Sequence, residues 1–96
     1  MADEQFLLVV YDISSDKRRT KLHNVLLDFG TPVQYSVFEC SLGPKALKQM
    51  LGRIKATIRP EKDRVRFYPI CERCVAKIRV TSGIEVLGGE KKTVIV

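Results

Sequence analysis

Asp12 is the residue whose position in this sequence most directly suggests chemistry. It follows the buried strand expected at residues 6–11, which contains the most apolar run of the chain, FLLVV. Four cations come soon after it: Lys17, Arg18, Arg19 and Lys21. A carboxylate can hold a hard cation such as Mg²⁺ together with water and phosphate oxygens, and cationic side chains can hold phosphates. The segment therefore suggests metal-dependent chemistry on a phosphodiester.

A single carboxylate is a poor metal site, so this interpretation of Asp12 needs a second copy of the chain. A two-fold axis near the strand end would present Asp12 twice, and symmetric dimers are the commonest oligomers. A cation held there would activate water for in-line attack on a phosphodiester. The structural alternative is that Asp12 caps a turn through a hydrogen bond to Ser14. From spacing alone, the turn is the commoner arrangement.

The cations have two interpretations as well. Arg18, Arg19 and Lys21 could hold phosphates at a helix start, or they could form a solvated helix face. Further cations follow along the chain: Lys45, Lys48, Arg53, Lys55, Arg64 and Arg66. Such a spread suits binding of a phosphate backbone without reading of the bases. His23 is a general base by type, but its place beside Leu22 predicts a half-buried packing role.

Three cysteines offer a further site by type. Cys71 and Cys74 form a CxxC pair, and Cys40 with the single histidine, His23, could complete four zinc ligands. Nothing in the spacing demands this, because a structural zinc site needs a second ligand pair. We expect two partly buried thiols in a turn or short helix. An odd number of cysteines also argues against a disulfide scaffold.

The bulk composition bounds the class of protein. The 96 residues suffice for one domain, 1–96, and an apolar content of 45% predicts a folded globule. Lys and Arg number 17 against 11 acids, giving a net charge of +6, which favours a nucleic-acid partner. No run is long enough to span a membrane, and acids occupy the N-terminus where a secretory signal carries cations. We therefore expect a cytoplasmic protein without membrane contact.

The first half of the chain predicts the elements that position Asp12. Residues 6–11 indicate a buried strand, and Ser14 or Ser15 is a suitable helix N-cap. An apolar helical face and a stop at Gly30 follow, the face comprising Leu22, Val25, Leu26 and Phe29. Residues 33–42 are rich in Val, Tyr and Phe and are either one kinked strand or a short hairpin.

The second half repeats this order. Pro44 opens a second helix that Pro60 closes, with an apolar face of Leu47, Met50, Leu51, Ile54 and Ile58. Strands are expected at residues 64–70, at 78–80 and at the terminal TVIV, residues 93–96. Alternating strands and helices of this length predict an α+β, ferredoxin-like two-layer sandwich, with a core at about 6–80 and a tail at about 81–96.

The sequence alone does not determine which sheet edge pairs with the terminal strand. An exposed β-branched strand after a glycine break invites pairing with a sheet edge. The edge could belong to a second copy of the chain or to the same chain. We expect the first, which would make the tail a dimer-exchange segment.

Three segments taken together resemble the small CRISPR-associated endoribonuclease family (Cas-two), the dimeric protein of spacer acquisition. They are VVYDISSDKRRTKL, FGTPVQYSVFEC and RVRFYPIC, and the resemblance runs over about residues 6–80. It implies a ferredoxin-like homodimer with the C-terminal strand crossing to the partner, and one magnesium ion shared on the two-fold axis. The catalytic and metal-binding position of the family falls on Asp12.

The resemblance also implies nucleic-acid-binding residues, with one departure. The family's positions fall on Arg18, Arg19, Lys21, Ser36 and Phe38. Several members have an arginine where this chain has Pro32, which puts a phosphate contact there in doubt.

The implied function is CRISPR adaptation with metal-dependent endonuclease activity on RNA or DNA. The alternative from the same resemblance is a non-catalytic, dimeric nucleic-acid-binding scaffold that bridges subunits of a CRISPR integrase. A third interpretation, a module that binds single-stranded RNA, lacks the exposed pair of aromatic residues on which such modules stack bases.

Overall fold

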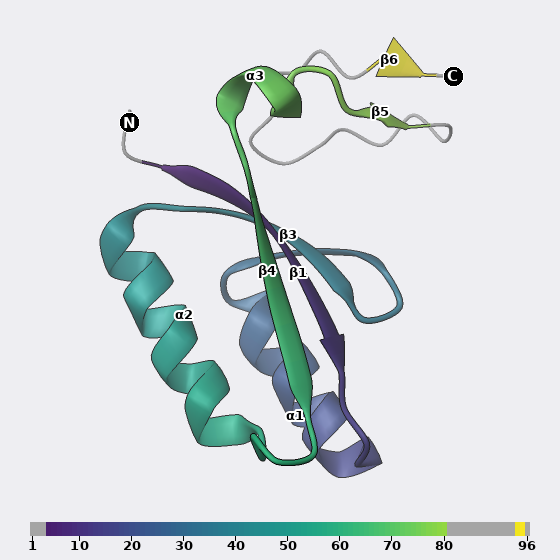
Figure 1. The fold of residues 1–96 in the computed structure, drawn as a ribbon, viewed down its shortest axis with the longest axis vertical. Helices are drawn as coiled ribbons and strands as arrows, with labels where there is room; N and C mark the ends of the chain where they lie inside the picture. Colours follow the sequence, from purple (N-terminus) through teal and green to yellow (C-terminus); the bar gives the residue numbers. More distant parts are fainter. Residues whose placement is uncertain (1–3, 81–93, 96) are drawn as a thin grey trace.

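The computed structural model describes residues 4–80 together with 94 and 95 (Figure 1). The elements run in chain order: β1 (Gln5–Asp12), α1 (Asp16–Leu27), β2 (Gly30–Gln34), β3 (Val37–Leu42), α2 (Pro44–Thr57), β4 (Arg64–Ile70), α3 (Glu72–Val75), β5 (Arg79–Val80) and β6 (Val94–Ile95). None of the helices in this part of the chain is long and apolar enough to cross a membrane.

Four strands form an antiparallel sheet in the order β2-β3-β1-β4, so the first strand lies at the centre. Helices α1 and α2 pack against this sheet, and β4 and β1 cross in front of α1 in Figure 1. This is the ferredoxin-like α+β sandwich that the sequence predicts, and it confirms the fold class.

The alternation of β1 determines which side chains reach the helices. Leu7, Val9 and Tyr11 are buried in the main core between sheet and helices. Because successive side chains of a strand point to opposite faces, Leu8, Val10 and Asp12 lie on the other, open face of the sheet. Asp12 is thus presented at the strand end, outside the core.

Helix α1 begins and ends by local rules. The Ser15 hydroxyl accepts a hydrogen bond from the Arg18 backbone N–H at 3.2 Å, which confirms Ser15 as the N-cap. Leu22, Val25 and Leu26 are the buried side chains of the helix, as its periodicity predicts. The helix ends at Leu27, before Gly30, so the expected helix stop is instead the first residue of β2.

Gly30 is required where β2 approaches β3. A Cβ on Gly30 would meet the Glu39 carbonyl oxygen and the Cys40 sulfur at distances that real side chains do not adopt. The glycine therefore permits close packing of two strands, a role different from the helix stop expected from the sequence.

Residues 33–42 are a hairpin, which resolves the ambiguity in the sequence. Strand β2 pairs with β3 and carries an irregularity between Pro32 and Gln34. Ser36, in the turn, has a φ of 59°, in the left-handed region that few residues other than glycine adopt. Its carbonyl oxygen accepts a hydrogen bond from the Tyr11 backbone N–H at 3.1 Å, which ties the turn to the end of β1.

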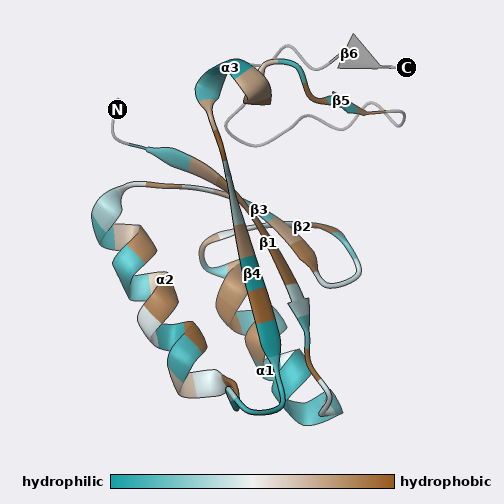
Figure 2. Ribbon diagram, in the orientation of Figure 1, coloured by the Kyte–Doolittle hydropathy of each residue, from teal (hydrophilic) through white to brown (hydrophobic). Residues whose placement is uncertain are grey.

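Helix α2 carries its apolar residues along one side (Figure 2). Pro44 occupies its first turn, and Met50 and Ile54 are buried, as predicted. Leu51, expected on the same face, is 41% exposed and therefore lies at the edge of the buried stripe.

A second, smaller core covers one end of the open face. The side chains of Phe6 and Val75 are buried there, with Ile70, Ile78 and Val80 packed around them. Beyond α3, β5 pairs in parallel with β6 of the same chain as a separate two-stranded sheet. Exchange of the C-terminal strand with a partner stays a prediction, and residues 81–93 and 96 of the expected tail lie outside the described residues.

Candidate metal and nucleic-acid site

Asp12 is an exposed carboxylate at the end of a strand. It is the last residue of β1 and lies opposite Arg64 of β4. A shallow pocket of about 250 Å³ surrounds it, and its lining is Val10, Tyr11, Asp12, Arg64, Arg66 and Tyr68. Within residues 4–80 and 94–95, the Asp12 carboxylate makes no hydrogen bond or ion pair. It is therefore available to an external ligand.

The turn that Asp12 could have capped is held by Asp63. Ser14 donates to Asp63 Oδ1 from its backbone N–H at 3.4 Å and from its hydroxyl at 3.5 Å. The Arg59 backbone N–H donates to Asp63 Oδ2 at 2.9 Å. The structural alternative for Asp12, a hydrogen bond to Ser14, is therefore wrong. Sequence reasoning missed Asp63, which lies far from Ser14 along the chain.

Arg18 completes the hydrogen bonding of Asp63. Its Nε donates to Oδ2 at 2.7 Å and its Nη2 to Oδ1 at 3.0 Å, and the Asp63 side chain is fully buried. These hydrogen bonds hold the pKa of Asp63 well below its usual range. The structure thus shows a structural ion pair at Arg18, whose side chain is 21% exposed.

The cations around Arg18 are more accessible. Arg19 donates from Nη1 to Asp16 Oδ1 at 2.6 Å and from Nη2 to the Ile13 carbonyl oxygen at 3.0 Å, and its side chain is 43% exposed. Lys17 and Lys21 are exposed, and neither has an ion pair in the described part of the chain. Of the predicted phosphate ligands, Arg19 and Lys21 therefore present charge to solvent.

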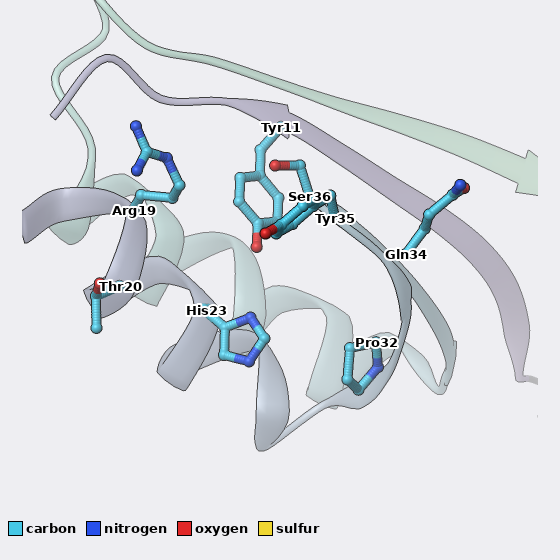
Figure 3. Close-up of a pocket in the computed structure, with 8 residues that line it drawn as sticks. All are labelled: Tyr11, Arg19, Thr20, His23, Pro32, Gln34, Tyr35 and Ser36. Atoms are coloured by element: carbon cyan, nitrogen blue, oxygen red, sulfur yellow. The ribbon is translucent and has the colours of Figure 1, made fainter. Parts of the chain in front are cut away.

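A pocket of about 410 Å³ lies between α1 and the β2–β3 turn (Figure 3). Its lining is Tyr11, Arg19, Thr20, His23, Pro32, Gln34, Tyr35 and Ser36. In Figure 3 the Tyr11 ring lies between Arg19 and Ser36, and His23 lies below it. Burial raises the pKa of the Tyr11 hydroxyl, and the Arg19 charge opposes that rise. Hydroxyls, an imidazole and a guanidinium in one pocket suit an anionic ligand.

This pocket brings two predicted residues together and adds others. Arg19 and Ser36 line it, and Lys21 and Phe38 do not. Tyr11 and Tyr35 were not among the predicted site residues. The sequence feature that could have identified Tyr11 is its position next to Asp12. Tyr35 is 95% exposed at the tip of the hairpin. The sequence did not distinguish this hairpin from a kinked strand, so it did not identify Tyr35.

Phe38 belongs to the core. Its side chain has no exposed surface, and its ring packs against His23 at 5.1 Å, edge to face, and against Tyr11 at 6.4 Å between centroids. A side chain so placed has no surface with which to contact a nucleic acid directly. His23 is half-buried against that ring, which confirms its predicted packing role.

The donors for a metal are few in one chain. Among residues 4–80 and 94–95, no three His, Cys, Asp or Glu side chains come close enough together to hold a metal ion. Cys40 is buried in the main core, and Cys71 and Cys74 are exposed on α3. Asp12 offers the oxygen chemistry that Mg²⁺ prefers, but as one carboxylate per chain.

Comparison with known proteins gives the relationship of this chain. The family model described as CRISPR associated protein Cas2 matches residues 5–78. A Methanospirillum hungatei protein named CRISPR-associated endoribonuclease Cas2 2 is 43% identical over 75% of this chain and 80% of its own length.

Two solved structures are similar as well. The crystal structure of Streptococcus pyogenes Cas2 shares 32% identity with a TM-score of 0.66, over 70% of this chain and 87% of that one. A chain of a partial Cas6-RT-Cas1–Cas2 complex shares 26% identity with a TM-score of 0.68, over 94% and 99%. The matching family model, the sequence identity and the shared fold together show that the chain belongs to the CRISPR-associated Cas2 family.

Proposed function

We propose that this chain is a CRISPR adaptation protein that cleaves phosphodiester bonds of RNA or DNA with a divalent cation held at Asp12. The observation that carries this proposal is the free carboxylate at the end of β1. Asp63 accepts the hydrogen bonds from Ser14 that Asp12 was expected to accept, and no hydrogen bond or ion pair among the described residues occupies the Asp12 carboxylate. The endoribonuclease name of the Methanospirillum hungatei relative supports the reaction type.

The donor set fits a hard cation only when two chains combine. One Asp12 is a single ligand, and two related by a two-fold axis would form the carboxylate pair that Mg²⁺ accepts alongside water. The open face of the sheet supports such a homodimer, because Leu8 and Val10 lie beside Asp12 and are only half-buried in the single chain. When bound, the cation would supply charge stabilisation and activation of the attacking water.

The neighbouring arginines suit the phosphate. Arg64 and Arg66 line the Asp12 pocket and are exposed. Arg66 Nη1 donates to the Tyr68 hydroxyl at 3.3 Å and Arg64 Nη1 to the Asp63 carbonyl oxygen at 3.4 Å. Neither arginine is paired with a carboxylate in the part of the chain that the structure describes. Their role in this proposal is to hold the phosphate oxygens and to orient the scissile bond toward Asp12.

A second surface would hold the rest of the nucleic acid. Lys17, Arg19 and Lys21 on α1 present cations beside the pocket that Ser36 lines. Reversing the charge of Lys17 and Lys21 to Glu should weaken binding uniformly across sequences and reduce its salt dependence, because phosphate contacts are lost. The double variant Lys48→Glu, Lys55→Glu on α2 is the control with equal charge change. An equal loss of nucleic-acid affinity in both double variants would show that α1 is not the specific binding surface.

The metal requirement is tested on the wild-type protein. RNA and double-stranded DNA are incubated with it in Mg²⁺ and in a chelator, and products are resolved on denaturing gels. Cleavage confined to the Mg²⁺ reaction is expected. Cleavage of equal rate in the chelator would contradict a cation at Asp12.

A non-catalytic scaffold that bridges integrase subunits is the second candidate. It is supported by the similarity to a chain of a complex containing Cas1 and Cas2, which spans 94% of this chain. A spacer-integration assay with a CRISPR integrase separates the two candidates. Integration that persists at the wild-type rate with Asp12→Asn, in a protein that never cleaves alone, would favour the scaffold.

A further inference from the structure

The CxxC pair at α3 is a cluster of nucleophilic side chains that the proposed function does not use. Cys71 and Cys74 are both exposed, whereas Cys40 is buried in the main core. The sequence predicts partly buried thiols here, so their exposure corrects that expectation. The pair lies between β4, a strand of the main sheet, and β5.

The backbone of α3 places the two sulfurs on one side of a single turn. The Val75 backbone N–H donates to the Cys71 carbonyl oxygen at 2.9 Å, which closes a full helical turn over residues 71–75. Residues three apart on such a turn are neighbours. Val75 occupies the opposite side, where it is buried against Phe6, so the turn is anchored to the sheet while both thiols face solvent.

The two thiols influence each other's ionisation. The backbone N–H and the thiol of Cys74 lower the pKa of Cys71. The same interaction raises the pKa of Cys74. The first cysteine is therefore the better nucleophile of the pair, because it forms the thiolate more readily than the second.

We propose that Cys71 and Cys74 are a redox-active dithiol that exchanges with low-molecular-weight disulfides to form an intramolecular disulfide. The Cys71 thiolate attacks one sulfur of the small disulfide, whose S–S bond breaks and releases one thiolate. Cys74 then loses its proton to solvent and attacks the Cys71 sulfur, which releases the second thiolate. Two protein thiols are oxidised to one disulfide, and one small disulfide is reduced to two thiols.

Buried Cys40 provides an internal control. Burial raises the pKa of Cys40 to about 11, and its side chain has no exposed surface. The native protein should therefore lose two of its three thiols in glutathione buffers of increasing oxidised fraction. The measurement is the intact mass after alkylation of the remaining thiols, with and without unfolding. A native protein in which Cys71 and Cys74 stay fully alkylatable when glutathione is wholly oxidised would overturn the proposal.

Single variants assign the two roles. Cys74→Ser should accumulate a mixed disulfide of Cys71 with glutathione, because nothing resolves it. Cys71→Ser should react about tenfold more slowly, since the activated thiolate is absent. The reverse pattern would overturn the assignment of Cys71 as the attacking group. Zinc bound by the purified wild-type chain, released only when both cysteines are alkylated, would overturn the redox role itself.

Discussion

At the scale of single residues, Asp12 and Asp63 differ in role, although the sequence suggests Asp12 alone for both a ligand site and a turn cap. Asp63 is buried and accepts hydrogen bonds from Arg18, Arg59 and Ser14, so it joins the start of α1 to the segment between α2 and β4. Asp12 is exposed and has no partner among the described residues. A carboxylate that has no side-chain partner among the described residues and lies at a strand end beside Arg64 and Arg66 is available for function.

Asp63 should make the stability of the fold depend on acid. Its pKa in the folded chain lies below the value of about 3.9 for an unperturbed aspartate. A group with a lowered folded pKa stabilises fully above the unfolded value and loses that contribution as pH falls below it. We therefore expect the free energy of unfolding to decrease as pH falls below about 4.

The variant Asp63→Asn tests the source of this dependence. It should unfold at a Tm several degrees lower at neutral pH, and its stability should change less with pH in the acid range. Asp28→Asn, which breaks the exposed ion pair with Arg53, is the control and should lower the Tm only slightly. Circular dichroism can follow the unfolding of both proteins in acid. If the stability of wild type and Asp63→Asn fell equally with pH, groups other than Asp63 would control the acid dependence.

At the scale of elements, the sequence predicts what local rules determine. The N-cap expected at Ser14 or Ser15, the helix start at Pro44 and the strand expected at residues 64–70 agree with α1, α2 and β4, because local sequence signals act within a few residues. The sequence did not distinguish a hairpin from a single kinked strand at residues 33–42, because Ser36 adopts its left-handed conformation without the glycine or asparagine that is typical of such turns. Asp63 was missed because its partner Arg18 lies 45 residues away.

Gly30 offers a test of packing between two elements. Gly30→Ala would place a Cβ against the Glu39 carbonyl and the Cys40 sulfur, which should destabilise the fold by about 1–3 kcal/mol. Gly52 is the matched control, because nothing lies within 4 Å of a Cβ there and the residue is exposed on α2. Gly52→Ala should stabilise by about 1 kcal/mol through helix propensity.

Urea denaturation of both glycine variants measures these changes. Opposite signs for the two substitutions are expected, with unchanged m-values. If Gly30→Ala were as stable as the wild type, β2 and β3 would not approach as closely as described.

At the scale of the whole molecule, the described elements cover one face of the sheet and leave the other partly bare. Helices α1 and α2 cover the first, and α3 covers only the Phe6 end of the second. The remainder combines half-buried Leu8, Val10 and Val37 with exposed Tyr68. Asp12 lies at the end of this bare surface, so a second chain packed there would bring two Asp12 residues near one axis.

The dimer is tested by changing that face alone. Wild type should sediment as a dimer at micromolar concentration, and Leu8→Lys should sediment as a monomer, because a charge would be buried at the contact. Leu51→Lys, at an exposed position on α2, should remain dimeric. A monomeric wild type would contradict the shared cation site. A dimeric Leu8→Lys would show that the dimer interface lies on another surface.

The most direct test of the account compares Asp12→Asn with Asp16→Asn in cleavage and in binding. Asp16 is an exposed carboxylate a short distance along the chain, so it controls for the loss of one negative charge. Asp12→Asn should lower the cleavage rate about 100-fold or more, while the fold and the metal-free affinity for nucleic acid persist. Asp16→Asn should cleave as the wild type does. Equal cleavage by all three proteins would contradict the central claim that Asp12 holds the catalytic cation.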